Sequence, residues 1–123
     1  MKAIGIACAV VALAGCAPQH YPGEYTRIHG PEPTKAEIEE ARGRMMSCFW
    51  RNAQQLDDQK SDAATIGRSV AGVCSAESND YARRRLWAST EQQKSAFYAG
   101  WDKTCAEIAT TAVLQRRRDL LDK

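Results

Sequence analysis

Residues 90–121, TEQQKSAFYAGWDKTCAEIATTAVLQRRRDLL, decide the fold. They contain no proline and are rich in Ala, Gln, Glu, Lys and Arg, which favour helices. Thr90-Glu-Gln-Gln93 is a capping box, in which two side chains satisfy open backbone N–H groups. Apolar residues then recur at spacings of three and four, which predicts one buried face. They are Phe97, Tyr98, Trp101, Cys105, Ile108 and Ala112. We expect one helix from Ser89 or Thr90 to about Leu121.

The same composition extends back to Thr34, and residues 34–123 lack proline altogether. Thr34-Lys-Ala-Glu37 is another capping box, and it predicts the start of a first helix. The helix should end near Leu56, because Asp57-Asp58-Gln59-Lys60 has the polar composition of a turn. The expected core face consists of Ile38, Ala41, Met45, Cys48, Asn52 and Leu56.

A middle helix is expected to begin at Ser61, a good N-cap residue, with Asp62 in the first turn. Its core face would contain Ile66, Val70, Val73, Cys74, Glu77 and Tyr81. Residues 75–80, SAESND, favour helix only weakly, and a break there would let Ser78 or Asn79 cap a short extra helix to about Ala88. The sequence thus predicts an all-α fold, a small antiparallel bundle of three helices, or of four if the middle one is broken.

After Met1, a single lysine, Lys2, precedes an apolar run, Ala3–Leu13, and this pattern is typical of a secretory signal peptide. The apolar run ends by Ala17, and its roughly 15 residues fall short of the roughly 20 that span a bilayer. Leu13-Ala14-Gly15-Cys16 resembles the lipobox of bacterial lipoproteins. The resemblance covers only the first 17 residues and implies a diacylglycerol on the Cys16 thiol. It also implies cleavage before Cys16 by a type II signal peptidase, followed by acylation of the new amino end.

The expected organisation is therefore a signal peptide at 1–15, a lipidated cysteine and flexible tether at 16–33, and a helical domain at 34–123. All four prolines and both histidines lie in the tether. His20 and His29 have no further ligand at a suitable spacing, so we expect no metal site. In Gram-negative lipoproteins, aspartate after the lipidated cysteine commonly causes retention at the inner membrane. Ala17 at that place implies the outer membrane, if the host is Gram-negative.

Three cysteines remain in the helical domain: Cys48, Cys74 and Cys105. The cell envelope is oxidising, which favours a disulfide, and the odd count leaves one thiol over. Residues that face each other across a hairpin lie symmetrically about its turn. Both Cys48–Cys74 and Cys74–Cys105 are feasible on this ground. We favour Cys48–Cys74, because a bridge across the first hairpin survives a break in the middle helix, and Cys74–Cys105 is the alternative. A catalytic thiol is not expected, because the domain has no histidine to activate one.

Charge is nearly balanced, with 17 Lys and Arg against 15 Asp and Glu, which gives no reason to expect nucleic-acid binding. Two arginine triplets stand out, at 83–85 and 116–118. Three consecutive helical residues spread over about 200°, so neither triplet forms one patch by itself. We interpret both as solvated surface with ion-pair contacts; attraction to anionic lipid or to an acidic partner is the alternative.

Four large apolar residues lie off the expected core faces: Trp50, Trp87, Leu114 and Leu121. Either a fourth helix or a bent C-terminus covers them, or they are anchors for a partner protein. The sequence shows no P-loop, no glycine-rich cofactor loop and no G-x-S-x-G motif. We therefore expect a protein that is not an enzyme, has no cofactor beyond the lipid, and acts in the envelope as an interaction or assembly factor. The alternative is an inhibitor, immunity or exclusion lipoprotein that binds a foreign protein.

Overall fold

The computed structural model describes residues 30–123, so the predicted signal peptide, Cys16, His20 and His29 lie outside the described residues. Within residues 30–123 there are four helices and no strand, which confirms the all-α bundle with a broken middle helix. The helices are α2 (Lys35–Leu56), α3 (Ala63–Val73), α4 (Ser75–Arg85) and α5 (Glu91–Leu121). Residues 32–123 form one compact unit.

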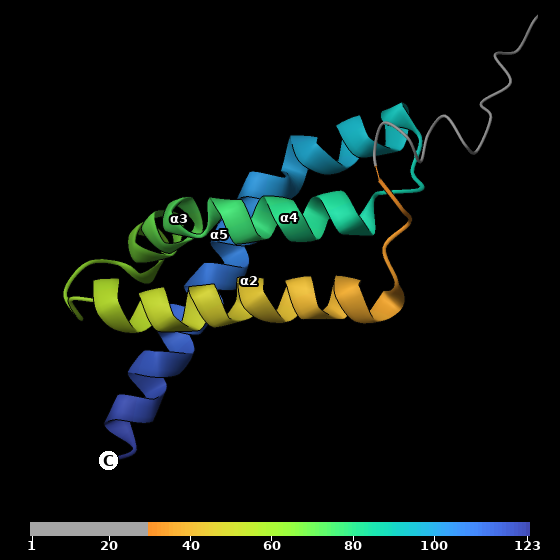
Figure 1. The fold of residues 1–123 in the computed structure, drawn as a ribbon. Coiled ribbons are helices and arrows are strands. Elements are labelled where there is room, and N and C mark those ends of the chain that lie inside the picture. The colour runs from red at the N-terminus through yellow and green to blue at the C-terminus, as the bar shows by residue number, and fades with distance from the viewer. Residues whose placement is uncertain (1–29) are drawn as a thin grey trace, which may run out of the picture. The chain divides into compact units, whose positions relative to one another are not determined.

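The four helices form two pairs. Helices α2 and α4 run antiparallel side by side, and α5 crosses behind them (Figure 1). Helix α3 packs mainly on α5, whereas α4 packs mainly on α2. Splitting the middle helix thus lets its two halves cover different neighbours.

Both predicted capping boxes are confirmed. At the start of α2, the Thr34 N–H donates to Glu37 Oε2 at 2.7 Å, and the Glu37 N–H donates back to Thr34 Oγ1 at 3.2 Å. At the start of α5, the Thr90 N–H donates to Gln93 Oε1 at 2.9 Å, with the reciprocal bond at 3.2 Å. Each box satisfies two backbone donors that a helix start leaves open.

The predicted cap of the middle helix is wrong by one residue. Asp62 is the N-cap of α3, and its carboxylate accepts from the backbone N–H groups of Ala64 and Thr65. Ser61 belongs to the preceding turn instead, because its hydroxyl donates to Asp58 Oδ2 at 2.7 Å.

The break in the middle helix comes at Cys74, earlier than predicted. Helix α4 begins at Ser75 without a side-chain cap, so the predicted caps at Ser78 or Asn79 are wrong. Ser78 is instead buried, and its hydroxyl donates to the Cys74 carbonyl at 2.9 Å. Helix α4 ends at Arg85, and its acidic first turn and basic last turn complement the helix dipole.

The core is made by one face of each helix. The largest fully buried side chains are Phe49, Val70, Val113 and Cys74. Three residues of the expected core faces are exposed instead: Leu56, Val73 and Tyr98. On α2 the buried face also includes Phe49 and Ala53, which the predicted stripe did not contain.

Helices α3 and α5 touch through their backbones at Gly67. A Cβ at this position would overlap Thr110 Oγ1 and lie 2.8 Å from the Thr110 backbone nitrogen. The Thr110 hydroxyl is already held by the Ala106 carbonyl, at 2.7 Å. Because a helix backbone cannot move away as a side chain can, the close crossing requires glycine here.

We therefore expect Gly67→Ala to lower the free energy of unfolding by about 1–3 kcal/mol, the usual cost of overpacking. Gly72→Ala is the matched control in the same helix, because a Cβ there meets nothing within 4 Å. The control should be neutral or stabilising by about 0.5–1 kcal/mol, since alanine is the better helix former. Urea denaturation of both variants measures the difference, and equal stabilities would contradict the close contact.

Candidate functional site

A disulfide joins α2 to the corner between α3 and α4. Cys48 and Cys74 are bonded with an S–S distance of 2.12 Å and a Cα–Cα distance of 5.9 Å. This is the pairing favoured from the sequence, because it survives the break in the middle helix. The Asn52 side-chain amide covers it, donating to the Cys48 carbonyl at 2.9 Å. The bridge thus fixes three helices at one point of the core.

Cys105 is the cysteine left over, and it is free and 4% exposed. Burial raises the pKa of the Cys105 thiol, and the negative charge of Asp102 acts in the same direction. Ser78 opposes this shift through a hydrogen bond. A thiol that stays protonated is a weak nucleophile, so the site favours a packing role for Cys105.

Cys105 and Ser78 lie at a groove of about 700 Å³ between α3, α4 and α5. Its lining is mainly apolar and includes several small residues, among them Ala64, Ala71, Gly72 and Ala106. Sequence reasoning missed this groove, because its lining comes from three helices and includes Thr110, the residue that Gly67 meets. The buried indole nitrogen of Trp101, another lining residue, has no hydrogen-bond partner within residues 30–123.

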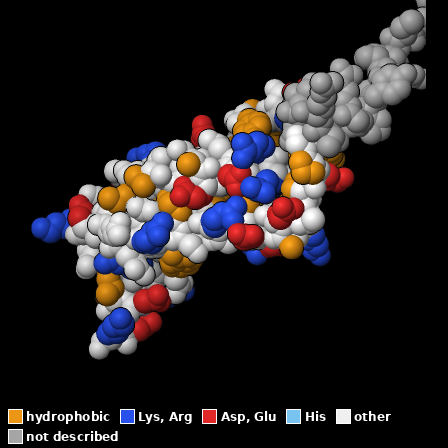
Figure 2. Space-filling view, viewed as in Figure 1, with side chains coloured by type: hydrophobic (Ala, Val, Ile, Leu, Met, Phe, Trp, Pro, Cys, Tyr) orange, Lys and Arg blue, Asp and Glu red, His pale blue; other side chains and the backbone are white. Residues whose placement is uncertain are grey.

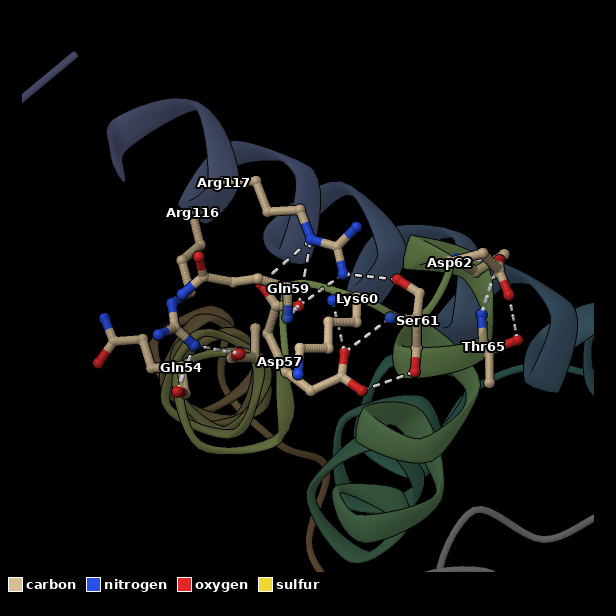
Figure 3. Close-up of polar contacts among 12 residues, drawn as sticks. Gln54, Asp57, Gln59, Lys60, Ser61, Asp62, Thr65, Arg116 and Arg117 are labelled. Atoms are coloured by element: carbon tan, nitrogen blue, oxygen red, sulfur yellow. Dashed lines mark hydrogen bonds and ion pairs between the residues drawn. The ribbon is translucent and has the colours of Figure 1, made fainter. Parts of the chain in front are cut away.

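The turn between α2 and α3 is clamped by α5 through a partly buried ion pair (Figure 3). The Arg117 guanidinium donates to Asp57 Oδ1 at 2.6 Å and to the Ser61 carbonyl at 2.7 Å. The Asp57 side chain is fully buried, and its carboxylate also accepts from the Gln59 N–H at 3.0 Å. The hydrogen bond from Arg117 holds the pKa of Asp57 below its usual value of 3.8.

Arg116, the neighbouring residue, caps the end of α2. Its Nη1 donates to the Ala53 carbonyl at 2.9 Å and also to the Gln54 carbonyl. Helix α2 has no basic residue in its own last turn, so α5 supplies the positive charge that a helix C-terminus favours. The second arginine triplet therefore has two inward-facing members that make structural contacts.

The first arginine triplet is balanced by acid. Asp80 accepts from Arg83 at 2.6 Å, from Arg84 at 3.0 Å and from Arg44 of α2 at 3.1 Å. Figure 2 shows basic and acidic side chains interleaved over this side of the molecule. These contacts fit the prediction of solvated surface with ion pairs.

Three of the four predicted partner-binding residues are exposed. Trp50 is 36% exposed on α2, and Leu114 and Leu121 are 51% and 86% exposed on α5. Trp87, in the turn after α4, is only partly buried, but its indole nitrogen is out of contact with solvent. Trp50 lies on α2, whereas the two leucines lie on α5.

The chain matches no protein-family model, no curated protein and no solved structure. Among residues 30–123, no helix is long and apolar enough to cross a membrane. The same residues contain no group of three or more His, Cys, Asp or Glu side chains placed to hold a metal ion.

The clamp generates a pH prediction. The pKa of Asp57 is lower in the folded protein than its usual value of 3.8. The ionised carboxylate therefore stabilises the fold at pH values well above 3.8. This stabilisation is lost as the pH falls below 3.8 and through the pKa of the folded state. Asp57→Asn should cost about 1–3 kcal/mol of unfolding free energy at pH 7, because Arg117 loses its charged partner. Urea denaturation at pH 7 and pH 2.5 measures both quantities.

The gap between wild type and Asp57→Asn should narrow at pH 2.5, because the carboxyl group of the unfolded wild-type chain is then protonated, which removes part of the advantage of the ionised folded form. Asp102→Asn is the matched control, since Asp102 is exposed on α5 and has no ion pair within residues 30–123. A gap that stays the same at both pH values would show that the charge of Asp57 does not stabilise the fold.

Proposed function

We propose that this protein is a lipid-anchored interaction or assembly factor of the cell envelope. Cys16 carries the lipid, the tether up to Pro33 spans the distance to the membrane, and the helical domain presents a binding surface to an envelope protein. The lipobox sequence supports the anchor. The rigid bundle, with its disulfide and its clamp, supports a role in which a fixed surface is displayed.

The observation that carries the proposal is the exposure of Trp50. Tryptophan is enriched among the residues that dominate binding energy, and Trp50 is 36% exposed whereas Phe49 and Trp101 are buried. Met46, one turn before Trp50, packs partly against the core and extends the apolar surface. Gly43, a further turn back, has open space around its Cβ position, so a partner can approach the backbone there.

The anchor is tested by Cys16→Ser, with Cys8→Ser as the matched control. Serine offers no thiol for the lipid, so the Cys16 variant should remain unprocessed or leave the membrane fraction. Cys8 lies in the predicted signal peptide and is discarded with it, so its variant should behave as wild type. Mass spectrometry of the membrane fraction decides the matter, and normal lipidation of the Cys16 variant contradicts the proposed anchor.

The binding surface is tested by placing a photoreactive residue at position 50 and crosslinking in living cells. We expect one resident envelope protein to be captured in quantity. Position 51 is the matched control, because Arg51 is also exposed on α2 but points about 100° away. Capture that is equal from both positions, or absent from position 50, would contradict a binding role for Trp50. Capture of a foreign protein alone would favour an inhibitor or immunity role.

A further inference from the structure

Helix α5 carries an exposed stripe that no other helix of the domain covers. Its residues follow each other at alternating spacings of four and three, so they stay on one face of the helix. They are Gly100, Thr104, Glu107, Thr111, Leu114, Arg118 and Leu121, and every one is exposed. We call this set the outer α5 stripe. Its two leucines, half and almost fully exposed, are large apolar groups left in water.

The outer α5 stripe is complementary to itself when two copies of α5 run antiparallel. A twofold axis between Ala112 and Val113 places Glu107 of each copy opposite Arg118 of the other copy. The same axis places Thr111 opposite Leu114, and Thr104 opposite Leu121. Each acid then meets a base, and each large leucine meets a smaller threonine.

The two charged residues are available for such a contact. The only ion pair of Glu107 within residues 30–123 is a long one, 3.9 Å to Lys103. The Arg118 guanidinium makes no hydrogen bond or ion pair among those residues, whereas Arg116 and Arg117 both reach inward. Arg118 is thus the one member of its triplet that the fold does not use.

The two threonines can face leucine without leaving a polar group unsatisfied. The Thr104 hydroxyl donates to the Gly100 carbonyl at 3.1 Å, and the Thr111 hydroxyl donates to the Glu107 carbonyl at 3.0 Å. Their methyl groups remain to pack against the opposing leucines. Desolvation therefore costs little at these positions, because the hydroxyls keep their hydrogen bonds.

We propose that the outer α5 stripe binds a second copy of this chain as an antiparallel, twofold-symmetric dimer. The stripe spans about 32 Å of helix at 1.5 Å per residue. A single helix pair buries less than the roughly 1,600 Å² of a standard interface, so we expect a Kd on the order of 10–100 μM. The proposed dimer uses neither the lipid nor Trp50. Its test is therefore independent of the tests of the proposed function.

The test is charge reversal in the full chain, followed by sedimentation equilibrium in a density-matched detergent. Glu107→Arg places two guanidinium groups opposite each other at both symmetric contacts, and Arg118→Glu does the same with carboxylates. Each single variant should weaken dimerisation at least tenfold. The double variant restores opposite charges across the axis, so its Kd should return to within about threefold of wild type.

Asp119→Arg is the matched control for Glu107→Arg, because it makes the same charge change on α5 away from the stripe. Asp119 bonds only Gln115, at 2.8 Å, within residues 30–123, and its variant should keep the wild-type Kd within about twofold. Circular dichroism checks that each variant is folded. A wild-type chain that stays monomeric to about 1 mM, single variants that dimerise normally, or a double variant that is not restored would each overturn the proposal.

Discussion

The corner at Cys74 is the constraint on which the rest of the bundle depends. Cys74 ends α3 and begins α4 with no loop between them, and its disulfide to Cys48 fixes that corner against α2. Closing a ring of this length should stabilise the fold by about 2–4 kcal/mol, mainly by restricting the unfolded chain. Because the corner is fixed, α4 is directed along α2 and α3 is left to pack on α5.

The contacts of α5 follow from that division. Along one face, α5 meets α3 so closely that Gly67 is required, and near its end two arginines hold the last turn of α2 and the turn that follows it. The ion pair between Asp57 and Arg117 can stabilise the fold because the carboxylate also accepts a hydrogen bond from the Gln59 N–H, which offsets the cost of removing its charge from water. The disulfide and the clamp hold opposite ends of the α3 segment, so α3 is tied at both its start and its end.

The helices themselves could be predicted from the sequence, because their signals are local. The capping boxes at Thr34 and Thr90 and the polar turn after Leu56 each act over four residues or fewer. The sequence places the helix break too late, because serine favours helix only weakly, whereas burial and a hydrogen bond to the Cys74 carbonyl hold Ser78 within α4. The arginine clamp joins residues about 60 positions apart, and no local pattern reveals which members of the triplet turn inward.

The exposed apolar residues were also only partly predictable from the sequence. The sequence identified Trp50, Leu114 and Leu121 because they lie off the apolar stripes, and the structure leaves all three exposed. What the sequence alone did not reveal is that Leu114 and Leu121 share a stripe with Glu107 and Arg118, because that requires knowing which side of α5 is already covered. Once Arg116 and Arg117 are assigned to the clamp, the remaining exposed face of α5 is defined by elimination. The bundle thus exposes Trp50 on α2 and two leucines on α5. In the proposed function, Trp50 binds the partner protein, which leaves the leucines of α5 for a second copy of the chain.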